Sequence, residues 1–144
     1  MLWAGRIEQV PPPFPRMRSI LPLLGLFLIS LTSVPPQKVL QVQMTEFAFR
    51  PRVISFSVGS LVTLHFVNRG QLAHQFETDY LHVFPAVITD DKMRVEIRGL
   101  DFVRLEPRAS GTLTFFARRR GRFPFACTIE GHREAGMEGI LEVR

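Results

Sequence analysis

From residue 39 onward, apolar and polar side chains alternate along the chain in short runs. The alternation is clearest in residues 39–44 and 93–98. A period of two places successive side chains on opposite faces of a β-strand, so one face of each run can be buried. The predicted strands are residues 39–44, 52–58, 61–67, 93–98, 112–117, 122–127 and 140–143. Gly, Pro, Asn and Asp separate these runs, and many short strands joined by such turns predict an antiparallel β-sandwich or barrel.

Two stretches deviate from this pattern. Residues 80–91 show no clear period, and we expect a loop with irregular strand there. Pro124 lies inside the predicted strand 122–127 and lacks the backbone N–H that a central strand needs, so it predicts an edge strand or a bulge. No window has a convincing helical period, and no internal repeat is visible.

The N-terminal segment differs from the strand-rich region. Arg16 and Arg18 precede residues 20–31, which carry no charge, and small residues follow. A basic segment followed by a short apolar stretch is typical of a secretory signal, either cleaved or kept as an N-terminal membrane anchor. Met17 is an alternative start of the chain. The expected organisation is a signal peptide or anchor at 1–33, a linker at 34–38 and one domain at 39–144. We therefore expect a periplasmic or otherwise extracytoplasmic protein, secreted or anchored by its N-terminus.

Composition narrows the function classes. The 144 residues include one cysteine, so an intramolecular disulfide and a Cys₄ or Cys₂His₂ zinc site are excluded. With 46% hydrophobic and 22% charged residues, the composition is that of a folded chain. The formal net charge of +5 falls to +3 once residues 1–33 are set aside.

The chemistry-bearing residues are concentrated near the C-terminus. Cys127, His132 and Met137 follow one another with four residues between each pair, in a loop after a predicted strand. His74, which follows another predicted strand, can supply a second imidazole. Two imidazoles, one thiolate and a weak axial thioether are the ligand set of a blue-copper site. Gly131 precedes His132 directly, and a glycine in the same position before Met137 allows the sharp turns that such a loop needs.

Residues 39–144 resemble the cupredoxins, the plastocyanin–azurin family of small blue-copper proteins. The motifs that carry the resemblance are Val58-Gly59, Leu64-x-Phe66-x-Asn68, Ala73-His74-x-Phe76, Gly121-x-Phe123-x-Phe125-x-Cys127 and Gly131-His132-x₃-Gly136-Met137. The last of these looks like the sulfocyanin-like or plastocyanin-like bacterial branch. The chain departs from the family at Gln75, where many members have Asn, and at Ala126, where some members have Tyr.

The resemblance implies a Greek-key β-sandwich of about seven to eight strands with copper at one end. By position, His74, Cys127, His132 and Met137 match the four ligands of the family. We expect one copper ion per chain, cycling between Cu(I) and Cu(II), in an electron carrier that is not an enzyme. The expected partners are redox proteins that dock transiently with a monomer. A copper-binding module for trafficking, storage or sensing is the alternative.

The chain has other histidines that could bind a metal. His65 lies on the polar side of its strand, which favours a structural role, whereas His82 lies in residues 80–91 and leaves a second metal site open. A cysteine protease is not expected, because it needs a base beside the thiolate and a residue that orients that base. A binuclear copper centre is not expected either, because it needs two cysteines and the chain has one. A multicopper oxidase needs several more histidine pairs than the chain has.

The run Arg118-Arg119-Arg120 with Arg122 forms a basic cluster on a predicted turn. A nucleic-acid partner is not expected, because no aromatic residues interleave with this cluster and the chain carries an export segment. We expect a solvated turn, or a patch that docks an acidic partner or a membrane surface.

Overall fold

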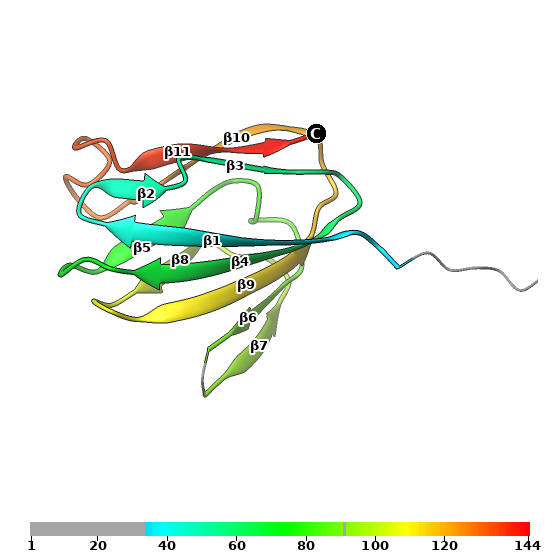
Figure 1. Ribbon diagram of the computed structural model, residues 1–144, viewed down its shortest axis with the longest axis horizontal. Coiled ribbons are helices and arrows are strands. Elements are labelled where there is room, and N and C mark those ends of the chain that lie inside the picture. The colour runs from blue at the N-terminus through cyan, green and yellow to red at the C-terminus, as the bar shows by residue number, and fades with distance from the viewer. Residues whose placement is uncertain (1–33, 91) are drawn as a thin grey trace, which may run out of the picture. The chain divides into compact units, whose positions relative to one another are not determined.

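The computed structural model describes residues 34–90 and 92–144 as eleven strands in two sheets (Figure 1). The first sheet has the order β2-β1-β4-β9-β6-β7 and the second has the order β3-β11-β10-β5-β8. The strands of the first sheet are β1 (Gln37–Thr45), β2 (Ala48–Arg50), β4 (Leu61–Asn68), β6 (Ala86–Thr89), β7 (Arg94–Ile97) and β9 (Ser110–Phe116). Those of the second are β3 (Val53–Phe56), β5 (His74–Glu77), β8 (Phe102–Leu105), β10 (Gly121–Ala126) and β11 (Glu138–Val143).

The all-β sandwich is confirmed, although several short strands were not predicted. β2, β5 and β8 have three or four residues each, too few for a period of two to be recognised, whereas β6 lies within residues 80–91, where irregular strand was expected. The predicted antiparallel pairing holds for most strand pairs and fails for two. β1 pairs with β4 in parallel, and β11 pairs with β3 in parallel. The pairing of strands that are far apart in sequence is decided by packing between sheets rather than by local pattern.

The edge position that Pro124 predicted for its strand was wrong, although the physical reason, the missing backbone N–H of proline, still applies locally. β10 lies between β11 and β5, so it is not an edge strand. Its pairing with β5, however, consists of Ala126 opposite Glu77 alone. At Pro124 the strand therefore has a partner on one side only, and the missing N–H breaks no ladder.

The core lies between the two sheets and is rich in aromatic rings. Phe49, Phe76 and Phe125 pack edge-on or tilted against one another, with centroids 4.8–5.9 Å apart. Such offset geometries place the positive edge of one ring against the negative face of another. This cluster adjoins the end of the sandwich that carries the candidate ligands.

The signal or anchor predicted at residues 1–33 lies outside the described residues, as does any test of Met17 as a start. Within the part of the chain that is described, no helix is long and apolar enough to cross a membrane.

Candidate metal centre

Three of the four predicted ligands meet at one end of the sandwich. His74 is the first residue of β5, Cys127 directly follows β10, and His132 lies in the loop before β11. The Nδ1 atom of His132 is 3.3 Å from Nδ1 of His74 and 3.3 Å from Sγ of Cys127. All three ligand atoms lie within 4.8 Å of one another, and all three side chains are buried. The structure therefore brings together residues that are 58 positions apart in the sequence.

The three donor atoms are better explained as ligands of a metal ion than as hydrogen-bond partners of one another. Two imidazole nitrogens and a thiol sulfur lie close enough together to hold one metal ion. Burial lowers the pKa of His74, and the nearby His132 lowers it further, so the neutral ring that a metal requires is favoured. A trigonal set of two imidazoles and one thiolate is the in-plane arrangement of type 1 copper sites.

The loop of residues 127–137 is closed by its own backbone hydrogen bonds. The N–H of Cys127 donates to the carbonyl of Met137 at 3.0 Å, and the N–H of Met137 donates to the carbonyl of His132 at 3.0 Å. Gly131 has φ of 78° and Gly136 has φ of 97°, in the left-handed region that glycine tolerates best. The role predicted for both glycines is thus confirmed by the backbone geometry.

Met137 is completely buried at the end of this loop and belongs to the hydrophobic core cluster. Its backbone contact with Cys127 brings it to the same end of the sandwich. Its role as the weak axial ligand remains a prediction.

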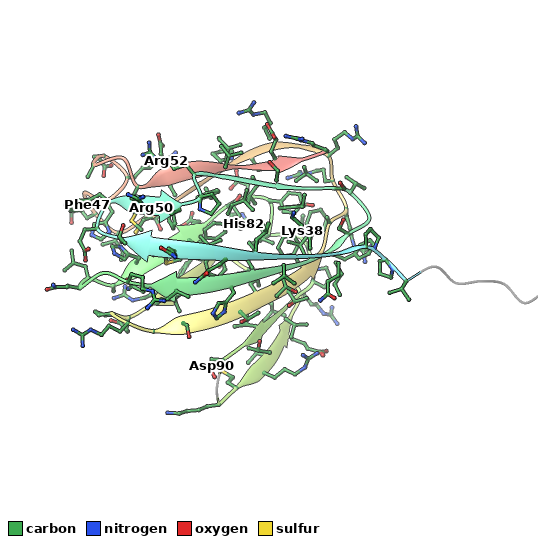
Figure 2. The ribbon with its side chains drawn as sticks, in the orientation of Figure 1. Lys38, Phe47, Arg50, Arg52, His82 and Asp90 are labelled. Carbon is green, nitrogen blue, oxygen red and sulfur yellow. The ribbon has the colours of Figure 1, made fainter. Side chains whose placement is uncertain are left out.

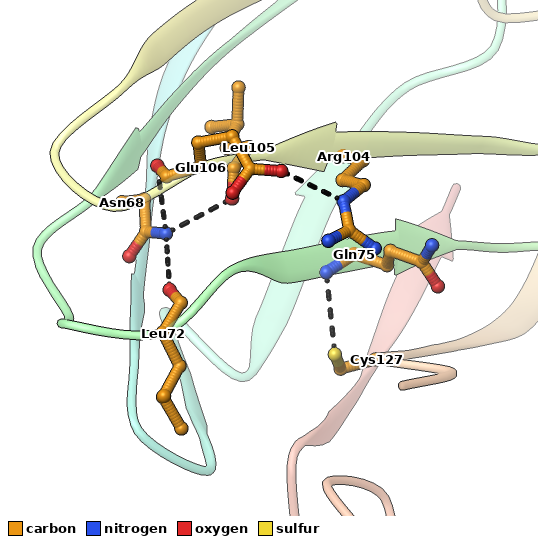
Figure 3. Close-up of polar contacts among 7 residues, drawn as sticks. All are labelled: Asn68, Leu72, Gln75, Arg104, Leu105, Glu106 and Cys127. Atoms are coloured by element: carbon orange, nitrogen blue, oxygen red, sulfur yellow. Dashed lines mark hydrogen bonds and ion pairs between the residues drawn. The ribbon is translucent and has the colours of Figure 1, made fainter. Parts of the chain in front are cut away.

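Hydrogen bonds at Gln75, where the chain departs from the family, join the two ligand-bearing segments. The Gln75 N–H donates to Sγ of Cys127 at 3.3 Å (Figure 3). The hydroxyl of Thr128 lies 2.8 Å from the side-chain oxygen of Gln75 and 2.8 Å from a carboxylate oxygen of Glu77. The hydroxyl can donate to one of these at a time, so Gln75 and Glu77 share the contact.

A second layer of contacts surrounds His74. Glu46, in the turn after β1, accepts hydrogen bonds from the N–H groups of Gln71 and Leu72. These backbone donors, that of Gln71 foremost, hold the pKa of Glu46 below its usual value, which keeps the carboxylate ionised. A Cβ atom on Gly70 would lie 3.0 Å from Nε2 of His74 and would also collide with the Glu46 carboxylate. The absence of a side chain at Gly70 therefore allows the loop to pass close to His74.

Asn68 also holds the loop that contains Gly70. The sequence pointed to Asn68 only as part of a family motif. Its side-chain nitrogen lies 2.8 Å from the carbonyl oxygen of Leu72 and 3.1 Å from those of Leu105 and Glu106 (Figure 3). Its side-chain oxygen accepts the N–H of Gly70 at 2.9 Å. A polar residue at the inward end of an apolar strand was the available signal, since a buried amide must find partners.

His132 lies closer to the surface than the other candidate ligands. Its residual exposure is 7%, against none for His74, Cys127 and Met137. The ring of Phe47 stands edge-on to the imidazole with centroids 5.3 Å apart, and Phe47 itself is 42% exposed. An apolar ring thus separates the imidazole from solvent at this end.

The two remaining described histidines lie away from the site. Nδ1 of His65 is 3.2 Å from the hydroxyl of Thr112, its cross-strand partner, as expected for a structural role. His82 lies 3.6 Å from the carboxylate of Asp79. Among residues 34–90 and 92–144, the group around Cys127 is the only cluster with three potential metal ligands from His, Cys, Asp or Glu.

Comparisons with known proteins agree with this geometry. No protein-family model matches the chain. The copper-resistant cuproprotein CopI of Rubrivivax gelatinosus is 31% identical over 111 residues, which are 75% of this chain and 67% of CopI. Auracyanin A, a "blue" copper protein from Chloroflexus aurantiacus, matches with a TM-score of 0.52 at 19% identity, over 75% of this chain and 99% of auracyanin A. A multicopper oxidase from Campylobacter jejuni matches with a TM-score of 0.59 at 17% identity, over 80% of this chain but 31% of the oxidase.

The structural likenesses establish the fold, and the match to CopI extends the similarity to sequence. The ligand geometry, the two-sheet topology and the sequence relative point to the same family. The chain belongs to the cupredoxins, the family of small blue-copper proteins.

Proposed function

We propose that the chain binds one copper ion through His74, Cys127, His132 and Met137 and carries one electron at a time between redox partners. The observation that supports this most directly is the convergence of three buried donor atoms, two Nδ1 atoms and one Sγ, at one end of the sandwich. Copper, when bound, supplies a Cu(II)/Cu(I) couple.

The candidate ligands have different roles in such a site. The thiolate of Cys127 is a soft donor that suits Cu(I), whereas the imidazoles of His74 and His132 suit both oxidation states. The candidate ligands are buried, and backbone hydrogen bonds within residues 127–137 help to hold Cys127 and His132 in place. A pre-organised site changes little between oxidation states, which keeps the barrier to electron transfer low.

We expect His132 and Phe47 to form the surface through which electrons leave. The residual exposure of His132 and the exposed edge of Phe47 place an apolar contact above the site. A small surface of this kind suits weak, transient docking of a monomer to redox proteins. The basic, apolar N-terminal sequence supports a periplasmic location, and no enzymatic activity is proposed.

A second function is favoured by one specific comparison. The relative CopI is named as a copper-resistant cuproprotein. A chain that binds copper in order to sequester or pass on the ion would use the same donors. The two functions differ in whether the electron or the ion leaves the site.

The first experiment tests the copper site itself. The copper-loaded wild type is expected to show the intense visible absorption typical of blue-copper proteins, and Cys127→Ser is expected to lose it because the thiolate is gone. His65→Gln is the matched control and should retain the band, since His65 bonds to Thr112 outside the site. Persistence of the band in Cys127→Ser would refute the assigned ligands.

The second experiment distinguishes the two functions. Rapid, reversible reduction and reoxidation of the bound copper, with the metal retained in the presence of a Cu(I) chelator, supports electron transfer. Loss of the ion to the chelator upon reduction supports trafficking instead. Stopped-flow absorbance measures the electron, and copper analysis after gel filtration measures the ion.

A further inference from the structure

Basic side chains gather at the end of the sandwich opposite the candidate ligands. We call this surface the basic end, and it consists of Lys38, Arg118, Arg119, Arg120, Arg122 and Arg144, all of which are exposed. Figure 2 shows Lys38 near one end of the sandwich and Phe47, which contacts His132, at the other.

Backbone hydrogen bonds join the segments of the basic end around one turn. The N–H of Gly59 donates to the carbonyl of Ala117 at 2.9 Å, directly before the arginine run. The N–H of Val58 donates to the carbonyl of Arg144 at 2.9 Å. The N–H of Leu61 donates to the carbonyl of Pro36 at 2.9 Å, where the chain enters β1. The arginine run, the end of β11 and the start of β1 therefore lie together.

The arginine run is held in place by neighbouring aromatic residues, and in the described part of the chain its guanidinium groups have no carboxylate partner. The N–H of Arg118 donates to the hydroxyl of the buried Tyr80 at 3.2 Å, and the guanidinium of Arg119 lies 4.5 Å from the centre of the Phe123 ring. Within residues 34–90 and 92–144, the ion pairs of the basic end join Glu142 to Arg122 and Arg144, and none involves the run 118–120. Three adjacent guanidinium groups thus face solvent without a carboxylate partner.

Apolar side chains lie beside these charges. Val58, in the turn at the centre of the basic end, is 39% exposed, while Val39 is 63% exposed and Val34 is 88% exposed. Cations combined with exposed apolar side chains match the surface of an anionic bilayer, where headgroups attract the cations and the interface accepts the valines. A nucleic-acid phosphate backbone is charged and polar, so exposed valines would not contribute to binding it.

The path of the chain agrees with a membrane surface. The uncharged residues 20–31 precede Val34 closely in sequence, and the described chain enters the domain at Pro36, within the basic end. Along the sequence, this uncharged stretch is therefore followed directly by residues of the basic end.

We propose that the basic end binds the anionic headgroups of a bilayer surface and turns the candidate copper site away from the membrane. The proposal does not depend on copper binding, because no ligand residue belongs to the basic end. It assigns a role to the arginine run that the proposed function leaves unexplained.

Binding of the full chain to vesicles tests the proposal. Phosphatidylcholine vesicles are compared with vesicles that also contain phosphatidylglycerol, by flotation at physiological ionic strength. The ratio of the two affinities is measured, so any contribution of residues 20–31 that is independent of lipid charge cancels. The wild type is expected to prefer the anionic vesicles by tenfold or more, on the order of what a few basic residues provide.

Two variants with equal loss of charge locate the surface. The triple variant Arg118→Gln, Arg119→Gln, Arg120→Gln is expected to lose most of the preference, and low salt should strengthen binding of the wild type more than that of this variant. The matched control replaces three cations away from the basic end, Lys92, Arg94 and Arg104, with Gln and should lose less than threefold. Circular dichroism of each variant verifies the fold.

Three outcomes would overturn the proposal. The first is equal affinity of the wild type for neutral and anionic vesicles. The second is a loss of preference in the control as large as in the arginine-run variant. The third is tighter binding to a short DNA duplex than to anionic vesicles, with the same dependence on Arg118–Arg120, which would assign the surface to nucleic acid.

Discussion

Replacement of Asn68 by alanine tests the account of how the loop beside His74 is held. Asn68 is 1% exposed, and its amide contacts three carbonyl groups and one N–H that belong to two segments, the loop with Gly70 and Leu72 and the end of β8. Asn68→Ala removes all of these contacts while leaving the strand itself in place. Among the described residues, no other side-chain hydrogen bond then links the loop with Gly70 and Leu72 to the end of β8.

The expected loss of stability follows from the number of bonds. An amide NH₂ group has two hydrogens, so two donated bonds and one accepted bond are lost, at about 1 kcal/mol each in net terms. A buried carbonyl left without a partner adds about 1–3 kcal/mol. The free energy of unfolding should therefore fall by roughly 4–6 kcal/mol, a large share of the roughly 5–15 kcal/mol of an ordinary domain.

Urea unfolding of the metal-free protein measures this loss. Thr112→Ala is the control, because Thr112 is half-buried and makes one side-chain bond to His65 at 3.2 Å, so its removal should cost about 1 kcal/mol or less. Asn68→Asp should be at least as destabilising as Asn68→Ala, because an acceptor oxygen would then face the carbonyls of Leu105 and Glu106. A loss below about 1 kcal/mol in Asn68→Ala, with unchanged amide exchange at Gly70, would refute the reasoning.

Three further predictions concern other parts of the domain. Gly139→Ala would place a methyl group 2.6 Å from a ring carbon of Phe125, and the strain should destabilise the protein by about 1–3 kcal/mol or more in thermal unfolding. Tyr80→Phe removes the acceptor of the Arg118 N–H and should cost about 1 kcal/mol in urea, whereas no change would show that the bond contributes nothing. The lowered pKa of His74 means that the unfolded chain binds a proton more readily than the folded one, so the metal-free protein should lose stability as pH falls below about 6.5, and His74→Phe should remove part of this dependence, as urea midpoints between neutral and acidic pH would show.

The ligand loop is the part of the site that sequence describes best. Cys127, His132 and Met137 are close in sequence, and the glycines between them report the backbone angles that the loop needs. Local spacing therefore sufficed to predict which residues approach one another. It did not reveal Glu46 or the amide contacts of Asn68, because their partners come from segments elsewhere in the chain.

The sequence by itself determined the fold class and the chemical identity of the candidate site. Alternation of apolar side chains is a local property, and it predicts strands without knowledge of their neighbours. The tertiary structure alone decided the parallel pairings of β1 with β4 and of β11 with β3, and the central position of the strand that contains Pro124. It also decided that His74, rather than His65 or His82, lies beside Cys127. These features depend on contacts between residues far apart in sequence, and such contacts form only when both sheets close on a common core.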